Sequence, residues 1–227
     1  MPTNLQLCAR LHQDLRIGGS LSTVVSQVGM LKRTVDSISK ANRSIQRRKT
    51  NWKFLWNSWE LTTVAGTSIY AGPTGLGSFD ETSFWKGVGT TDAQKVTFIK
   101  YKDFREVHRQ AYITSDEVQF ITLQPDGRVK LLPTPVSSGE IITGEYWRKP
   151  VDLTSDAQIS LIPEQFHDII IARAKVYMAE MKSNNGWYQA GMVEFDDIYA
   201  QLKAHSLPGY EDDNKSESSI SRVIEVI

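Results

Sequence analysis

The sequence predicts an α+β fold: a helical bundle, formed by N-terminal helices and a C-terminal helical hairpin, with an inserted antiparallel β subdomain and an extended C-terminal tail. Apolar residues recur every three or four positions near the N-terminus and again after Pro163, as in helices that face a core. Between these regions, short β-rich segments alternate with Gly, Pro, Ser and Thr. We therefore expect a helical subdomain of residues 1–59 and 160–208, a β subdomain of residues 60–159 and a tail of residues 209–227.

Length and composition indicate a soluble globular protein. With 227 residues, 40% of them hydrophobic, the chain can bury a substantial core. Its formal net charge is zero, so binding to nucleic acid or to a membrane would have to rest on local patches. The single cysteine, Cys8, lies among leucines and is expected to be a small buried hydrophobe. We found neither a signal-peptide core nor an apolar run of about 20 residues, so we expect a cytoplasmic origin and no membrane partner.

Two helices are predicted in the first 50 residues. Thr3 or Asn4 can cap a short helix that ends at the Gly18-Gly19 pair. A longer helix follows, in which Asn42 interrupts the apolar stripe. The stripe consists of Val28, Leu31, Val35, Ile38 and Ile45.

Residues 31–53 carry the strongest local charge, eight basic residues against the single acid Asp36. One interpretation is a solvated helix face with cations favourably placed near a helix C-terminus. The other is a face turned toward DNA or an acidic neighbour, where phosphate contacts would bring no sequence specificity. Four of these cations lie close together near the predicted end of the helix: Arg43, Arg47, Arg48 and Lys49.

The stretch NWKFLWNSW holds three of the six tryptophans, Trp52, Trp56 and Trp59. Helical patterning precedes it and strand patterning follows it, so we interpret it as the junction between the two subdomains. This interpretation predicts that Trp56 and Trp59 are buried and that Lys53 and Asn57 are exposed.

Six strands are predicted in the β subdomain, and the hairpin around Gln124-Pro125-Asp126-Gly127 is the clearest feature. The segment between Gly72 and Asp92 contains Phe79, Phe84 and Trp85 and is long for a connection. It is either a docking loop with exposed aromatic residues or a loop that folds back and buries Trp85. The predicted strands are 60–64, 67–70, 95–101, 117–123, 128–132 and 141–147.

The helical hairpin is predicted to start at Pro163, whose missing N–H group costs nothing in the first turn. Its first helix has an apolar stripe, and a break at 184–186 separates it from a second helix that ends before Pro208. The first stripe consists of Phe166, Ile170, Ala174, Tyr177 and Met181. The second consists of Tyr188, Met192, Phe195, Ile198, Tyr199 and Leu202.

The tail begins with acidic residues and ends with the alternating sequence SSISRVIEVI. Such a strand is not stable alone, so it either pairs with the chain's own sheet or augments the sheet of a neighbour; a disordered tail is the alternative. The residues of this strand include Ile220, Arg222, Val223, Ile224, Val226 and Ile227.

No motif indicates catalysis, a metal or a cofactor, and we expect that the protein is not an enzyme. His108 lies between Arg105 and Arg109, which disfavours a metal ligand, and no nucleophile motif or glycine-rich phosphate loop is present. The acidic residues near 194–197 fit no familiar metal spacing.

The order of these features resembles the head-to-tail adaptors of tailed bacteriophages, also called head–tail connectors. The resemblance covers about residues 3–208; its most specific parts are the tryptophan-rich stretch followed by AGTSIY, and SLIPEQFHDIIIARA after the YWRKP strand. It implies a ring, commonly of twelve copies, between the portal protein and the next tail component, which is a nozzle or a terminator. Genome DNA would pass through the ring without sequence-specific contact. In such a ring, the candidates for charges at the lumen or at a subunit interface are Arg43, Arg47, Arg48 and Lys49. The residues expected to contact the portal or a neighbouring subunit are Ile220, Arg222, Val223, Ile224, Val226 and Ile227. The protein would be made in the host cytoplasm and reside in the virion at the head–tail junction.

Two other functions remain open at this stage. The chain could be another ring-forming tail component, the terminator or the nozzle itself. It could also be a non-specific DNA-binding protein, because Trp52 and Trp56 lie beside the basic segment.

Overall fold

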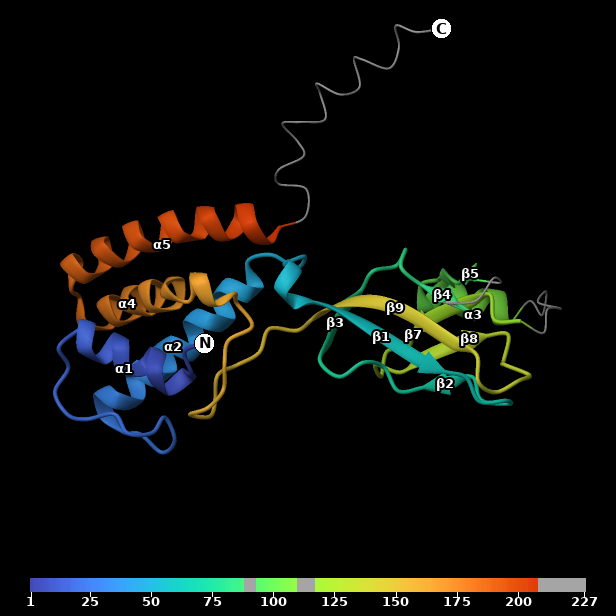
Figure 1. Cartoon of the computed structure of the whole chain (residues 1–227), viewed down its shortest axis with the longest axis horizontal. Coiled ribbons are helices and arrows are strands. Elements are labelled where there is room, and N and C mark those ends of the chain that lie inside the picture. The colour runs from blue at the N-terminus through green and yellow to red at the C-terminus, as the bar shows by residue number, and fades with distance from the viewer. Residues whose placement is uncertain (88–92, 110–116, 208–227) are drawn as a thin grey trace, which may run out of the picture. The chain divides into compact units, whose positions relative to one another are not determined.

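The computed structural model describes residues 1–87, 93–109 and 117–207 and divides the chain into two compact units (Figure 1). The helical unit comprises Met1–Leu55 and the chain from Pro150 onward, and the β unit comprises Trp56–Lys149. Both boundaries lie earlier than the predicted ones. The first strand already begins at Trp56, and the residues after Lys149 pack onto helices. The prediction of an α+β fold is confirmed.

Four α-helices and two short 3₁₀ turns build the described part of the helical unit. They are α1 (Asn4–Asp14), α2 (Gly29–Arg47), η1 (Lys53–Leu55), η2 (Glu164–Phe166), α4 (Asp168–Lys182) and α5 (Asn185–Ser206). Helix α4 contacts α1, α2 and α5. In Figure 1 it lies between α5 on one side and α1 and α2 on the other. It is therefore the central helix of the bundle.

Helix α1 is capped as its sequence predicts. The Thr3 hydroxyl accepts a hydrogen bond from the Gln6 N–H, and the Gln6 side chain accepts one from the Thr3 N–H. Cys8 is completely buried, as expected. Burial, with a smaller contribution from the charge of Asp156, raises the pKa of its thiol to about 12.

The predicted apolar stripe of α2 is partly wrong. Val28 is the N-cap residue and is 77% exposed. The buried face is instead rich in polar side chains: Thr34, Ser37, Ile38, Ala41, Asn42, Ile45 and Gln46. Polar groups fit this buried face because it packs partly against irregular backbone, whose N–H and C=O groups need partners.

That irregular backbone is residues 150–162, here called the returning segment, which leads from the β unit to α4. The Asn42 side chain donates to the Val151 carbonyl at 2.8 Å and accepts from the Ser160 hydroxyl at 2.6 Å. The side-chain Oε1 of Gln46 accepts a hydrogen bond from the Val151 N–H at 2.9 Å. Two side chains of α2 thus replace the hydrogen bonds that a helix or sheet would supply.

The N-terminal region holds the other side of the returning segment. The backbone N–H of Asn4 donates to the Gln158 carbonyl at 2.8 Å, and its side chain donates to the Ser155 carbonyl at 3.2 Å. The Asp156 carboxylate accepts from the Thr23 hydroxyl at 2.8 Å and from the Val24 N–H at 2.5 Å. The returning segment is therefore held by hydrogen bonds to α2 and to the N-terminal region.

The C-terminal hairpin differs in detail from the prediction. Pro163 precedes the η2 turn, and α4 itself begins at Asp168. Because α4 is central, most of its circumference is buried, whereas Met181 in its last turn is 47% exposed. Gly191 of α5 allows the close approach of the two helices, since a Cβ there would lie 2.9 Å from the Val176 side chain.

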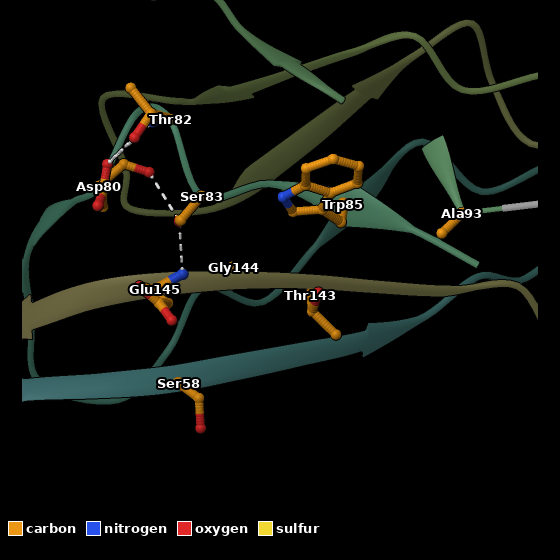
Figure 2. A pocket seen from close by; sticks show the side chains of 9 residues that line it. All are labelled: Ser58, Asp80, Thr82, Ser83, Trp85, Ala93, Thr143, Gly144 and Glu145. Atoms are coloured by element: carbon orange, nitrogen blue, oxygen red, sulfur yellow. Dashed lines mark hydrogen bonds between the residues drawn. The ribbon is translucent and has the colours of Figure 1, made fainter. Parts of the chain in front are cut away.

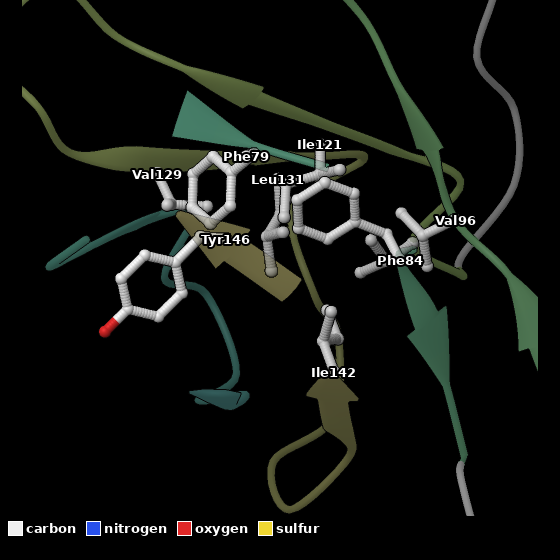
Figure 3. Packing of buried hydrophobic residues seen from close by; sticks show 9 residues of the cluster. Phe79, Phe84, Val96, Ile121, Val129, Leu131, Ile142 and Tyr146 are labelled. Carbon is white, nitrogen blue, oxygen red and sulfur yellow. The ribbon is translucent and has the colours of Figure 1, made fainter. Parts of the chain in front are cut away.

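Two sheets build the β unit. The first has the order β1 (Trp56–Thr62), β9 (Ile141–Arg148), β4 (Trp85–Lys86), β5 (Gln94–Lys95), with β3 (Leu76–Phe79) also paired to β9. The second has the order β2 (Ile69–Tyr70), β8 (Val129–Leu132), β7 (Phe120–Leu123), β6 (Thr97–Phe98). Side chains from both sheets form one core: Phe79, Phe84, Val96, Val118, Ile121, Val129, Leu131, Ile142 and Tyr146 (Figure 3).

The hairpin of β7 and β8 is confirmed, with Gly127 at a φ of +83° in its turn. The predicted long loop between Gly72 and Asp92 is wrong, because it contains β3 and β4, and Phe79 and Phe84 are buried. One strand pair, β6 and β7, is parallel rather than antiparallel. A parallel pair needs a crossover connection, and α3 (Tyr101–Arg109) lies in the chain between these two strands.

Replacing Asn42 with Ala should destabilise the helical unit by about 1–3 kcal/mol, because the Val151 carbonyl and the Ser160 hydroxyl lose their partner. Urea unfolding followed by far-UV circular dichroism would measure this. Ser39→Ala on the same helix is the control and should change the free energy of unfolding by less than about 0.5 kcal/mol. Equal effects of the two changes would contradict the assigned role of Asn42.

Candidate assembly surfaces

The C-terminal end of α2 is fastened to α5 by a cation and aromatic rings. The Arg48 guanidinium lies 4.7 Å from the ring centroid of Phe195 and 4.9 Å from that of Tyr199. These two rings stack on each other at 5.4 Å, and Trp52 meets Tyr199 edge-on at 6.2 Å. We call Arg48, Trp52, Phe195 and Tyr199 the aromatic cluster.

The four predicted charges of the basic segment fall into two pairs. Arg43 lies 3.1 Å from Asp152 of the returning segment, and Arg48 belongs to the aromatic cluster. Arg47 and Lys49 are exposed, and neither forms an ion pair with a residue that the structure describes. Arg43 and Arg48 therefore make contacts within the chain, although Arg48 is itself exposed, and Arg47 and Lys49 are exposed without such contacts to described residues.

The three tryptophans of NWKFLWNSW differ in exposure. Trp52 is completely buried, and Trp59 is half-buried with its ring 5.8 Å from that of Phe79. The predicted burial of Trp56 is wrong, because this side chain is 49% exposed. Lys53 is exposed as expected, but Asn57 is half-buried and donates to the Tyr146 hydroxyl at 3.0 Å. Alternation along β1 explains the difference, since Trp56 points to the opposite face from Asn57.

The helical unit has two unlike outer surfaces. On the outer face of α5, Val193 is 71% exposed and lies one turn before the acidic pair Asp196 and Asp197. Helix α2 lies at the other side of α4 (Figure 1), and its exposed residues include Lys32, Arg33 and the acid Asp36. The exposed surface of α5 is therefore apolar and acidic, and that of α2 is mainly basic.

The β unit has a recess of about 560 Å³ beside the exposed Trp85 (Figure 2). The Asp80 carboxylate there accepts hydrogen bonds from the Thr82 N–H at 2.9 Å and hydroxyl at 2.7 Å. The Ser83 hydroxyl donates to the Asp80 carbonyl and accepts from the Glu145 N–H, each at 2.8 Å. These groups stabilise a turn. Across the described chain, no cluster of three metal-ligating side chains occurs.

Sequence reasoning missed a buried lysine in the β unit. Lys86 is 4% exposed, and its ammonium lies 2.8 Å from a Glu117 carboxylate oxygen and 3.9 Å from one of Glu140. The hydrogen bond from Lys86 holds the pKa of Glu117 below its usual value. The residue lay in a segment predicted to be a loop, where a lysine would be exposed.

The predicted contact residues of the tail lie outside the described part of the chain, which ends at Leu207. The side chain of His108 is likewise outside it. Among the described helices, none is both long and apolar enough to cross a membrane.

These features define a class of protein: a small helical bundle, interrupted in sequence by a two-sheet β unit, with chemically different outer surfaces. The sequence model of the SU10 adaptor protein matches residues 6–211, and the chain belongs to this family of phage head-to-tail adaptors. The predicted resemblance is thereby confirmed. The family consists of structural proteins of the phage particle rather than enzymes. A search of curated proteins found no match.

Replacing Arg48 with Ala should lower the free energy of unfolding of the helical unit by about 1 kcal/mol, because Phe195 and Tyr199 each lose the nearer of their two cations. The neighbouring change Arg47→Ala is the matched control, since it removes the same charge from an exposed side chain outside the aromatic cluster. Chemical denaturation at low and moderate salt would compare them. Equal losses would mean that net charge, rather than the aromatic cluster, determines the effect.

Proposed function

We propose that this adaptor forms a closed ring of twelve copies below the portal, joins the capsid to the next tail component and lets genome DNA pass through its centre. Membership of the adaptor family carries this proposal. The chain would be made in the host cytoplasm and assembled at the head–tail junction. The next tail component is a nozzle or a terminator.

The two outer surfaces of the helical unit support ring formation. Identical copies that meet through different surfaces form a ring when the rotation closes. The outer face of α5 presents Val193, Asp196 and Asp197, and α2 presents Lys32 and Arg33 on the other side of α4. Contact between α5 of one copy and α2 of the next would bury apolar surface and pair opposite charges.

The distribution of cations is compatible with a passage for DNA. A strongly basic lining would hold DNA through many phosphate contacts. Within the predicted set, Arg43 is paired with Asp152 and Arg48 is held over the aromatic cluster, whereas Arg47 and Lys49 are exposed without such contacts and are the best placed to meet a neighbour or the lumen. The junction role of Trp52, Trp56 and Trp59 stays a prediction.

Two alternatives have weaker support. Another ring-forming tail component, a terminator or nozzle, would share the ring but not the match to the adaptor family. A non-specific DNA-binding protein is favoured by the exposed Arg47 and Lys49 at the end of α2. Such a protein would bind short duplex DNA in the absence of portal, and its affinity would fall steeply as the salt concentration rises.

Ending the chain after Tyr210 should leave a folded protein that no longer joins portal rings, because the tail would supply main-chain hydrogen bonds to the portal or to a neighbour. Co-sedimentation with purified portal measures joining, and circular dichroism measures folding. Undiminished joining by the shortened chain would refute the role of the tail.

Val193→Asp should prevent ring closure without unfolding the monomer, because the new charge would lie in the proposed apolar contact beside Asp196 and Asp197. Native mass spectrometry of the protein with portal would count the copies. Val193→Thr has nearly the same shape and no charge, and it should still form rings. Full assembly of the Asp variant would place the lateral contact elsewhere.

A further inference from the structure

Strand β1 is the edge of its sheet. In the described part of the chain it pairs only with β9, over all seven of its residues. The direction of its backbone groups follows from the bonds of β9. On the side of β9 away from β1, the Glu145 carbonyl accepts from the Asp80 N–H, and the Ile141 carbonyl accepts from the Gly87 N–H. Backbone groups alternate in direction along a strand, so the N–H and C=O groups of Ile142, Gly144 and Tyr146 point toward β1.

The register then fixes which groups of β1 are unpaired. Leu61, Trp59 and Asn57 lie opposite Ile142, Gly144 and Tyr146 and use their N–H and C=O groups toward β9. The alternate residues Ser58, Glu60 and Thr62 therefore direct theirs to the free edge.

This edge lacks the usual protection. Natural edge strands are shielded by lysines, prolines, bulges or short length, whereas β1 is seven residues long with Glu60 as its single charge. The side chains also lack cover. Trp56 is 49% exposed, and Trp59 and Leu61 are only half-buried against the core. A strand added here would complete both the hydrogen bonds and the apolar contacts.

We propose that the C-terminal strand of a neighbouring copy, residues 220–226, adds antiparallel to the free edge of β1. Charge and apolar complementarity set the register: Arg222 lies opposite Glu60, Val226 opposite Trp56 and Val223 opposite Trp59. A parallel strand with the same ion pair would place serines, Ser218 and Ser221, opposite the two tryptophans. Of the two registers that pair Arg222 with Glu60, only the antiparallel one gives both tryptophans apolar partners.

A neighbour as the donor fits the ring proposed above. Each chain has one β1 edge and one tail, so strand addition from copy to copy would add main-chain hydrogen bonds around the whole ring. The residues between Leu207 and the added strand, 208–219, would span up to about 40 Å if fully extended. The inference rests on the tail role proposed above and specifies its acceptor.

Cysteine cross-linking tests the register. A chain with Thr62→Cys is mixed with a chain with Ile220→Cys in the presence of portal rings and oxidised. The two positions are opposite each other, with Cα atoms about 5.5 Å apart, which suits a disulfide. Cys8 should stay inert, because it is buried and its thiol pKa is raised. We expect a disulfide-linked dimer from the mixture.

Two controls make the result specific. Thr62→Cys mixed with Ser221→Cys should give no dimer, because Ser221 would point to the opposite face. Glu60→Arg should lower the cross-linked fraction about fivefold, and Arg222→Glu on the donor chain should restore it.

Three outcomes would overturn the inference. The first is that no disulfide forms in the mixture. The second is that a chain carrying both cysteines forms the disulfide only within itself, and the third is that chains ending at Leu207 still associate through β1. If no link forms while the chain ending after Tyr210 still fails to join portal, the tail binds elsewhere. The proposed function would then stand, and the acceptor assigned here would be wrong.

Discussion

The helical unit depends on the hydrogen bonds that hold the returning segment, residues 150–162. This segment connects the β unit to the second half of the helical unit, and it has almost no regular structure of its own. Its backbone groups are satisfied by Asn42 and Gln46 of α2 and by Asn4 at the start of α1. Helices separated by more than 100 residues of sequence are thereby joined into one bundle, and the central helix α4 can follow the segment directly.

Strand β9 has the corresponding role in the β unit. It pairs with β1 on one side and with β3 and β4 on the other. Gly144 keeps the core face of β9 open for Phe84, since a Cβ there would lie 2.5 Å from the phenyl ring. The arrangement leaves one long edge, because β1 has no second partner among the described strands. The same strand pairing that places β9 at the centre of the sheet therefore leaves the outer edge of β1 open to an added strand.

Local patterns predicted much of this fold. The capping of α1, the β7–β8 hairpin and the two C-terminal helices follow from spacing and turn residues, which act within a few positions. The polar buried face of α2 could not be predicted, because its partners lie more than 100 residues away. For the same reason β3 and β4, which pair with the distant β9, lie in a stretch whose local sequence predicts a loop. The exposure of Trp56 depends on its edge position, which only the sheet order reveals.

The candidate surfaces show why charge counts alone are a poor guide to function in this chain. The basic segment suggested a single patch, yet the structure distributes its cations among different tasks. Arg43 holds the returning segment, Lys40 lies 4.0 Å above the Tyr177 ring, and Arg48 joins α2 to α5. A cation beside a carboxylate is paired within the fold, whereas a cation over an aromatic ring keeps its charge but is held in place by the ring. For the proposed passage of DNA, cations held within the fold would make fewer phosphate contacts and would resist sliding less.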